Sequence, residues 1–153
     1  MTARATAQRK EVEVAPLLCA CANLRRAARA VTQLYSQEIR RSGVDATQFG
    51  LLMALARAGE TTQGRLGEHL VIDSTTLTRT LAPLRARGWI ASKPGADRRQ
   101  RLWRLTPAGR RQLQRARPHW ERAQKLLRKA LGEAEWNSLQ TSVARTAQAA
   151  QHA

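Results

Sequence analysis

The sequence is poor in acidic residues. Its 153 residues include 11 aspartates and glutamates against 27 lysines and arginines, which leaves a formal net charge of +16. A charge of this size is extreme for a soluble enzyme and implies an anionic partner, either nucleic acid or a membrane surface. The length suits one compact domain with a modest core.

Long apolar runs and export signals are also absent. No apolar run approaches the roughly 18 residues that a membrane span requires, so we expect no membrane partner. The first ten residues are polar and basic and lack the apolar stretch of a secretory signal. We expect residues 1–14 to be a basic disordered arm on a cytoplasmic protein, where Cys19 and Cys21 stay reduced.

Motifs that carry chemistry are scarce. The sequence has no C-x-x-C motif, nucleophile elbow, phosphate-binding loop or paired-carboxylate site. His69, His119 and His152 are scattered without the spacing of metal ligands. Because residues two positions apart on a helix point about 200° away from each other, the thiols of Cys19 and Cys21 are not expected to meet on one helix. We therefore expect no enzyme, no cofactor and no metal site.

What the sequence does contain is a helix-turn-helix pattern. A short helix is predicted over 63–70, and Asp73 or Ser74 caps the start of a second helix. Gly88 supplies the left-handed residue that ends this second helix. Its buried stripe is formed by leucines at helical spacing: Leu77, Leu81 and Leu84.

The outward face of this second helix suits a DNA major groove, where small polar and cationic side chains contact base edges, thymine methyl groups and phosphates. Downstream, residues 89–93 and 101–105 are predicted as two strands of a hairpin with a charged turn between them. The pattern is that of a winged helix-turn-helix. The outward residues of the helix are Thr75, Thr78, Arg79, Ala82 and Arg85.

This stretch resembles the MarR family of winged-helix transcription regulators. The resemblance is carried by Leu66-Gly67-Glu68-His69-Leu70, by Asp73-Ser74-Thr75-Thr76-Leu77-Thr78-Arg79, by Gly88-Trp89-Ile90, and most specifically by residues 97–109, which follow the family's D-x-R…LT-x-x-G wing signature. It covers nearly the whole chain from about residue 15. It implies a mainly α-helical fold with a small β wing and with N- and C-terminal dimerisation helices.

Helices are predicted on both sides of the winged region. Residues 15–45 are assigned to an N-terminal dimerisation helix, 46–106 to the DNA-binding lobe and 107–153 to C-terminal dimerisation helices. Asp45 and Gln48 resemble a capping box, and Thr106-Pro107 is a helix start. The buried side of the helix that follows Asp45 is expected to hold Phe49, Leu52, Met53 and Ala56.

The flanking helices carry apolar seams that the small winged core cannot cover. One alternative is a homodimer in which the terminal helices of two chains interlock, an arrangement that the resemblance also implies. The other is that these helices fold back on their own domain. A two-fold dimer would place its recognition helices roughly 34 Å apart on a near-palindromic operator.

The expected DNA contacts lie on the second helix and on the wing. The resemblance implies that the wing tip reaches the flanking minor groove, where Arg99 is the candidate to enter a narrow A·T-rich stretch. Asp97 would brace the tip by pairing with an arginine, and Arg98 and Arg101 would contact phosphates. The full set is Ser74, Thr75, Thr76, Thr78, Arg79, Arg85, Asp97, Arg98, Arg99 and Arg101.

Two routes of regulation stay open. Cys21 has a cation one turn away, which favours a reactive thiolate, and the resemblance implies a reactive cysteine at this place in the family's organic-hydroperoxide sensors. The alternative is a small buried residue on the helix seam. The second route is a small aromatic or anionic effector, with Arg25, Arg29, Tyr35 and Trp120 as candidate lining residues.

The leading hypothesis is a dimeric repressor that is released from DNA by a ligand or by thiol oxidation. A weakly specific architectural DNA-binding protein without an effector is the second hypothesis. A thiol enzyme or redox carrier that uses Cys19 or Cys21 is the third, and no motif supports it.

Overall fold

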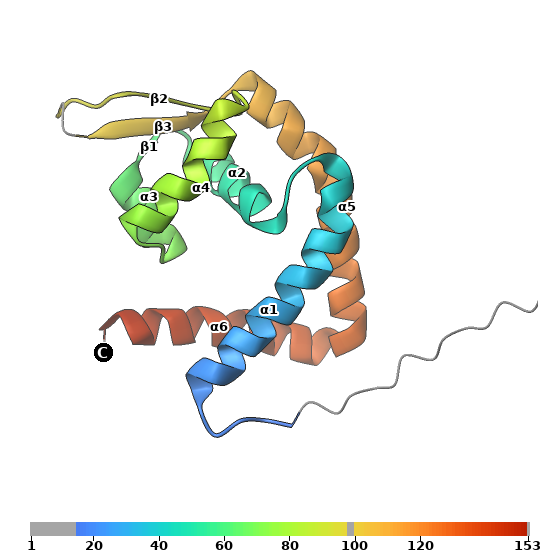
Figure 1. Cartoon of the computed structure of the whole chain (residues 1–153). Helices are drawn as coiled ribbons and strands as arrows, with labels where there is room; N and C mark the ends of the chain where they lie inside the picture. Colours follow the sequence, from blue (N-terminus) through green and yellow to red (C-terminus); the bar gives the residue numbers. More distant parts are fainter. Residues whose placement is uncertain (1–14, 98–99, 153) are drawn as a thin grey trace, which may run out of the picture.

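The computed structural model describes residues 15–97 and 100–152. The element order is α1 (Ala20–Ile39), a short 3₁₀ helix η1 (Arg40–Ser42), α2 (Ala46–Ala58), β1 (Thr61–Thr62), α3 (Gln63–Leu70), α4 (Ser74–Ala86), β2 (Ile90–Pro94), β3 (Arg101–Leu105), α5 (Pro107–Leu131) and α6 (Glu133–His152). In Figure 1, α2, α3, α4 and the sheet form a lobe from which α1 and α5 extend toward α6. The predicted fold class is confirmed.

The core lies where α2 meets α1, α4, α5 and the sheet. Each of these elements contributes one apolar face, so the buried side chains are contiguous and their removal from water is the main driving force for folding. The largest fully buried side chains are Ile39, Leu51, Leu52, Leu55, Leu66, Leu77, Leu81, Leu84 and Ile90.

The sheet has three antiparallel strands in the order β1-β3-β2. The register pairs Ile90 with Leu105 at the base of the hairpin and Pro94 with Arg101 near its tip. Thr61 pairs with Trp103 and Thr62 with Leu102, so β1 adds a short third strand to the predicted hairpin. The sheet therefore anchors the wing to the start of α3.

Side-chain caps fix where the helices begin. Asp45 and Gln48 form the predicted reciprocal capping box at α2. At α5, the Thr106 hydroxyl oxygen accepts from the Gly109 amide at 3.0 Å and the hydroxyl donates to the Gly88 carbonyl at 2.7 Å. A Cβ added to Gly109 would collide with the carbonyl group of Trp89. The first turn of α5 therefore sits directly on the backbone that enters β2.

The first helix is shorter than predicted. It was expected from about residue 15, but α1 begins at Ala20, and Cys19 is its N-cap residue with extended backbone angles (φ −101°, ψ 119°). The amide side chain of Asn23 accepts from the Leu17 N–H at 2.9 Å and donates to the Leu17 carbonyl at 2.7 Å. Arg26 donates to the Ala15 carbonyl at 2.7 Å. These bonds hold residues 15–19 as a folded-back loop instead of a helical turn.

The prediction for the buried side of α2 is correct for two of its four residues. Phe49 and Leu52 are buried, but Met53 is 39% exposed and Ala56 is also exposed. Leu51, Ala54 and Leu55 are buried in addition, because α2 is covered from several sides by α1, α4, α5 and β3. A simple one-face pattern does not describe such a central helix.

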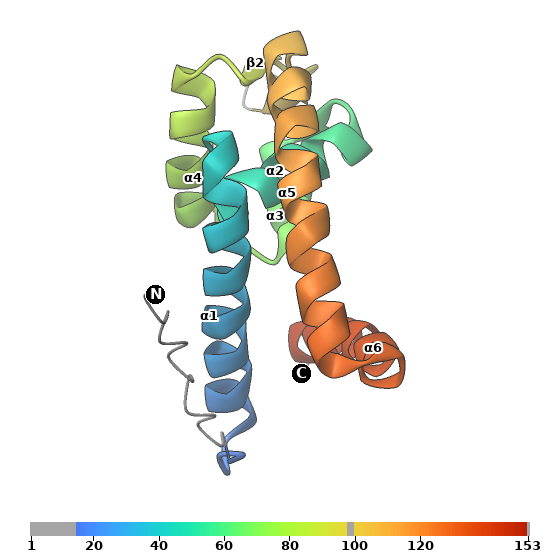
Figure 2. The same ribbon diagram turned by 90° about the vertical axis from the view of Figure 1, so that its right-hand side faces the viewer.

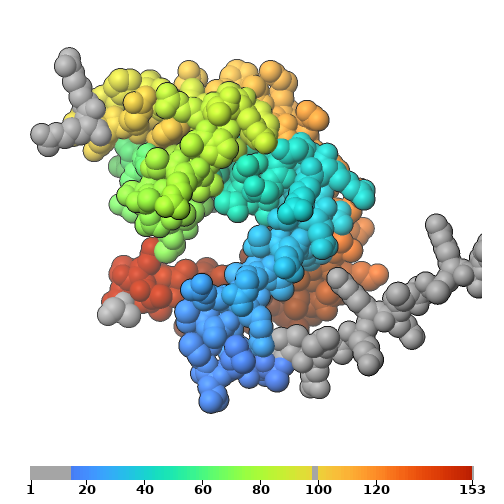
Figure 3. Space-filling view, viewed as in Figure 1, coloured from blue at the N-terminus to red at the C-terminus, as the bar shows by residue number. Residues whose placement is uncertain are grey.

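Helix α6 and the far ends of α1 and α5 extend away from the lobe. Figure 2 shows α1 and α5 packed side by side, with α6 across the end of α5. None of the residues of α6 is buried, and Figure 3 shows open space between α6 and the winged lobe. Of the two arrangements considered for these helices, folding back on the chain's own lobe does not cover α6.

Candidate DNA-binding site

Helix α4 is held by a cap at its start and a leucine stripe along its inner side. The Asp73 carboxylate accepts from the Thr76 amide at 2.9 Å, and hydrogen bonds from Thr76 lower the pKa of Asp73. Leu77, Leu81 and Leu84 are at most 1% exposed. The helix continues through Pro83 to Ala86, so this proline does not end it.

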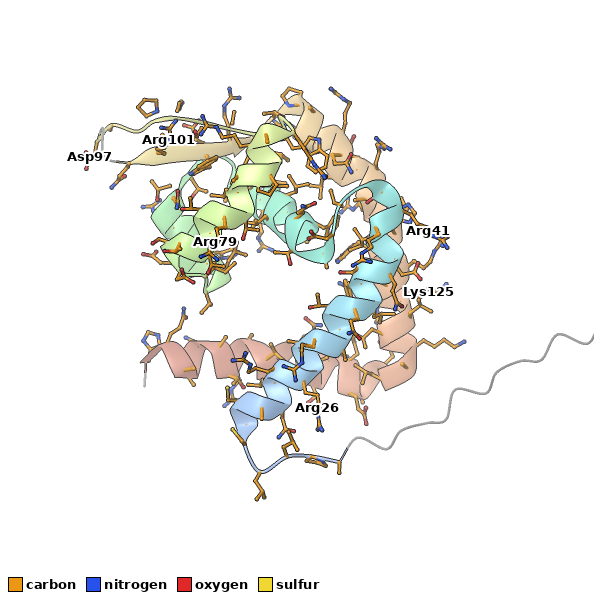
Figure 4. The ribbon with its side chains drawn as sticks, in the orientation of Figure 1. Arg26, Arg41, Arg79, Asp97, Arg101 and Lys125 are labelled. Atoms are coloured by element: carbon orange, nitrogen blue, oxygen red, sulfur yellow. The ribbon has the colours of Figure 1, made fainter. Side chains whose placement is uncertain are left out.

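The outer side of α4 faces solvent as predicted. In Figure 4, Arg79 projects from this helix away from the core. The helix thus presents an unobstructed surface of hydroxyl and guanidinium groups, which is the chemistry that reads major-groove edges and phosphates. The predicted residues on this side, all exposed, are Ser74, Thr75, Thr76, Thr78, Arg79 and Arg85.

A tight turn sets the angle between α3 and α4. Val71 ends α3 in the left-handed region (φ 54°), where non-glycine residues are uncommon. The Ile72 amide donates to the Gly67 carbonyl at 2.9 Å, and a Cβ on Gly67 would lie 2.9 Å from the Ile72 carbonyl oxygen. Gly67 is therefore needed for the close approach of the turn to α3.

The wing carries cations beside α4. Lys93 pairs with Glu60 at 2.9 Å, and Arg101 donates from Nε to the Ser92 hydroxyl at 3.2 Å. Figure 4 places Arg101 and Asp97 along the same extended hairpin. The candidate minor-groove residues Arg98 and Arg99 lie outside the described residues, and the expected bracing by Asp97 stays a prediction.

Gln63 belongs to this site and was missed by the sequence reasoning. As the first residue of α3, it donates from Nε2 to the Thr78 hydroxyl at 2.8 Å. It also lines a cleft of about 430 Å³ between the starts of α3 and α4 and strand β3, together with Ser74 and Arg101. Gln63 and Ser74 are 11 residues apart in the sequence. This separation predicts no contact unless the geometry of the turn between α3 and α4 is known.

The far end of α4 is tied to the junction between α1 and α2. Arg87 donates to the Gly43 carbonyl at 2.9 Å and lies 4.8 Å from the ring centroid of Trp89, a cation–π distance. The buried Gln112 of α5 donates to the neighbouring Ser42 carbonyl. The turn at residues 40–43 is thus hydrogen-bonded both to the end of α4 and to α5.

The structure changes the picture of the two cysteines. Both are exposed in the described chain, so Cys21 is not a buried seam residue within one chain. Cys19 is not helical, so the argument that two thiols on one helix point apart does not apply to this pair. The candidate role of Cys21 as a sensor stays a prediction.

The four candidate ligand residues do not line one cavity within the chain. The Tyr35 hydroxyl donates a hydrogen bond to Gln124 Oε1 at 2.7 Å, and burial raises the pKa of Tyr35. Tyr35 lines a cavity between α1, α5 and α6, whereas Trp120 lines a separate one and stacks on Phe49 at 5.8 Å. Arg25 and Arg29 are exposed and line neither cavity.

A different cavity has the character expected for an anionic ligand. It has a volume of about 420 Å³ and lies between α2 and the first half of α5. Phe49, Met53 and Leu113 give it an apolar lining, and three arginines add positive charge: Arg57, Arg110 and Arg117. One of these, Arg117, lies 3.5 Å from Glu121 in an exposed ion pair.

Among the described residues there is no group of three or more histidine, cysteine or acidic side chains that could hold a metal ion. In the same part of the chain, no helix is both long and apolar enough to cross a membrane.

The exposed recognition helix, the tight turn before it and the paired wing after it define a winged helix-turn-helix DNA-binding protein. A family model described as MarR family matches residues 42–100. The Mycobacterium tuberculosis transcriptional regulator MosR, solved in complex with DNA, is 35% identical over 88% of this chain and 97% of MosR, with a TM-score of 0.80.

Two other relatives agree. BpsR of Bordetella bronchiseptica, whose DNA binding is regulated by 6-hydroxynicotinic acid, is 26% identical over 88% of this chain and 99% of BpsR, with a TM-score of 0.75. The uncharacterised helix-turn-helix regulator YwoH of Bacillus subtilis is 28% identical over 83 residues, which are 54% of this chain and 61% of YwoH. The chain belongs to the MarR family of DNA-binding transcriptional regulators, and its fold is not that of an enzyme.

Proposed function

We propose that this regulator is a homodimeric, sequence-specific repressor that leaves a near-palindromic operator when a small ligand binds or a thiol is oxidised. The observation that carries the proposal is the exposed polar and cationic side of α4, fixed between the α3 turn and the wing. As a DNA-binding repressor it would act in the cytoplasm. Its operator contacts would be those predicted on α4 and on the wing.

The uncovered apolar surface of the terminal helices supports a dimer. Leu24 is 42% exposed and Val143 is 46% exposed, and both line an apolar cavity of about 550 Å³ between α1, α5 and α6. Contiguous apolar surface of this kind on a soluble chain usually marks an interface. A second copy that inserts its own α1 and α6 would cover it and would place two recognition helices about one DNA turn apart.

Exposure of both thiols supports the oxidation route. An organic hydroperoxide would transfer one oxygen to the Cys21 sulfur and leave as the alcohol, which converts the thiol to a sulfenic acid. Oxidation can release DNA only if it favours a dimer whose helix spacing no longer fits the operator.

The arginine-rich cavity between α2 and α5 supports the ligand route. A flat aromatic carboxylate would place its ring against Phe49 and Leu113 and its charge near Arg57 or Arg110. Because this cavity joins the DNA-binding lobe to the long α5, an occupant touches both parts.

The decisive experiment is fluorescence anisotropy on DNA from upstream of the protein's own gene, with and without an organic hydroperoxide or an aromatic carboxylate. Release of the wild type by peroxide but not of Cys21→Ser, with reversal by a thiol reductant, supports sensing at Cys21. Cys19→Ser tests whether the second thiol takes part. Release by the carboxylate that is lost in Arg110→Met but kept in Arg111→Met supports the ligand route. Equal affinity for operator and scrambled DNA would favour the architectural alternative.

A further inference from the structure

The hydroxyl group of Thr78 is already engaged inside the protein. Its Oγ1 donates to the Ser74 carbonyl at 2.7 Å, which uses the single hydrogen that a hydroxyl owns. The same oxygen accepts from Gln63 Nε2 at 2.8 Å. Thr78 therefore has no hydroxyl hydrogen left to offer to a DNA base.

The orientation of the Gln63 amide follows from its neighbours. Its Nε2 also lies 3.4 Å from the Ser74 carbonyl oxygen, and the Thr78 hydroxyl directs its hydrogen toward that same carbonyl. Both neighbours therefore present acceptors to Gln63, so the NH₂ group and not the oxygen must face them. Thr78 is thus held from two sides, by its own helix and by the first residue of α3, in one side-chain rotamer.

The methyl group of Thr78 takes part in neither of these hydrogen bonds. The residue is exposed on the outer side of α4, and the C5-methyl of thymine is the apolar group that the major groove presents. We propose that Thr78 reads a thymine through methyl–methyl contact, and that Gln63 is the positioning residue that holds Thr78 for this contact. The inference rests on the proposed binding of α4 to an operator and names what one of its residues recognises.

The chain contains a matched control on the same helix. The Thr80 hydroxyl donates to the Thr76 carbonyl at 2.8 Å, so it makes the same bond to the preceding turn. Thr80 is half-buried next to the leucine stripe and not on the outer side. Thr80→Ser therefore removes the same methyl group from a position that does not face the groove.

The test replaces single thymines in one operator half-site with deoxyuridine, which lacks only the C5-methyl, and measures affinity by anisotropy. Wild type is expected to lose about fourfold at one position, the factor that corresponds to about 0.8 kcal/mol for one buried methyl-sized group. Thr78→Val keeps a methyl but lacks the oxygen that Gln63 holds, so its ratio should fall between fourfold and one, as in the Gln63 variants below. Thr78→Ser keeps the hydroxyl and should bring the ratio to about one, whereas Thr80→Ser should leave it at about fourfold.

Gln63→Met tests the positioning role at similar side-chain length. It should lower the thymine-to-uracil ratio while binding to non-specific DNA stays the same, which a general loss of folding would not produce. Gln63→Leu repeats the test if the methionine variant is not stably folded.

Several results would overturn the inference. They are the absence of any uracil-sensitive position in an operator that wild type binds, retention of the fourfold ratio by Thr78→Ser, or an unchanged ratio in folded Gln63 variants. The failure of wild type to prefer any operator would instead contradict the proposed function, and it shows before the uracil scan begins.

Discussion

Gln112 of α5 donates a hydrogen bond from Nε2 to the backbone carbonyl of Ser42, 70 residues earlier, at 2.5 Å. Both residues are nearly inaccessible, at 6% and 5% exposure. The Ser42 hydroxyl in turn donates to the Ile39 carbonyl at the end of α1. Three segments that meet at the base of the DNA-binding lobe are thus joined by two hydrogen bonds inside the core.

Gln112→Leu should lower the free energy of unfolding by about 1–3 kcal/mol, because it leaves a buried carbonyl without a partner. Urea denaturation measures the change. Gln114→Leu, two residues further along α5 and exposed, is the matched control and should stay within about 0.5 kcal/mol. A Gln112 variant as stable as the control would mean that water reaches the Ser42 carbonyl.

Asp73→Ala should lower the midpoint of thermal unfolding at neutral pH, because the start of α4 loses its cap. Hydrogen bonds lower the pKa of Asp73 in the folded state, so its contribution is complete above the ordinary carboxyl pKa of about 3.9. The contribution disappears as pH falls through the lower, folded-state pKa. Asp73→Asn keeps a capping oxygen and should stay near wild type at neutral pH. A difference between Asp73→Ala and wild type that does not shrink in acid would contradict the assignment.

Arg79→Ala should reduce discrimination between the operator and mismatched sites by about 1–3 kcal/mol if the guanidinium contacts a base edge. A phosphate contact would instead weaken binding to all sequences alike and lower the salt slope by about one unit. Competition binding at several salt concentrations separates the two results. Lys129→Ala, near the end of α5 away from the recognition helix, should change neither quantity.

Arg99→Ala should weaken binding most on operators with A·T-rich flanks, because a narrow minor groove attracts a guanidinium. Anisotropy on paired operators that differ only in their flanks gives the measurement. Arg104→Ala, on the body of β3, is the control for loss of one positive charge on the wing. Equal losses on A·T-rich and G·C-rich flanks would rule out insertion of Arg99 into the minor groove.

Val143→Asp should break the dimer, because it places a charge on the uncovered side of α6. Leu127→Asp would be a less clean test, because Leu127 is half-buried against its own chain. Light scattering after size exclusion measures the mass, and circular dichroism confirms that the variant is folded. Thr141→Asp, an exposed position on the opposite side of the same helix, tests whether any added charge has this effect. A dimer of undiminished mass in Val143→Asp would count against the proposed interface.

Local chemistry made much of this fold predictable. Asp45, Asp73 and Thr106 cap helices at the positions where the sequence placed them, because capping depends on residues within one turn. The start of α1 was misplaced because Asn23 and Arg26 reach back to the loop before it. These side chains compete with the helix for backbone hydrogen bonds, and the hydrophobic periodicity of the sequence does not reveal such bonds.

The functional site likewise has a part that could be predicted from the sequence and a part that could not. The outer residues of α4 follow from helical spacing and were predicted. The bond from Gln63 to Thr78 and the cavity that contains Arg57 and Arg110 each join two elements, so neither follows from the spacing within one element. The placement of Met53 failed for the same reason, since a helix covered from several sides has no single buried stripe.

The contact between Gly109 and the carbonyl of Trp89 has one more consequence. With no room there even for a methyl group, the start of α5 is packed directly on the backbone that enters the wing, and we expect the two to move as one unit. In the proposed dimer, we therefore expect an effector to act by changing the separation of two such units. The released protein should therefore keep the intrinsic affinity of each half for a single half-site and lose only the avidity of engaging both at once.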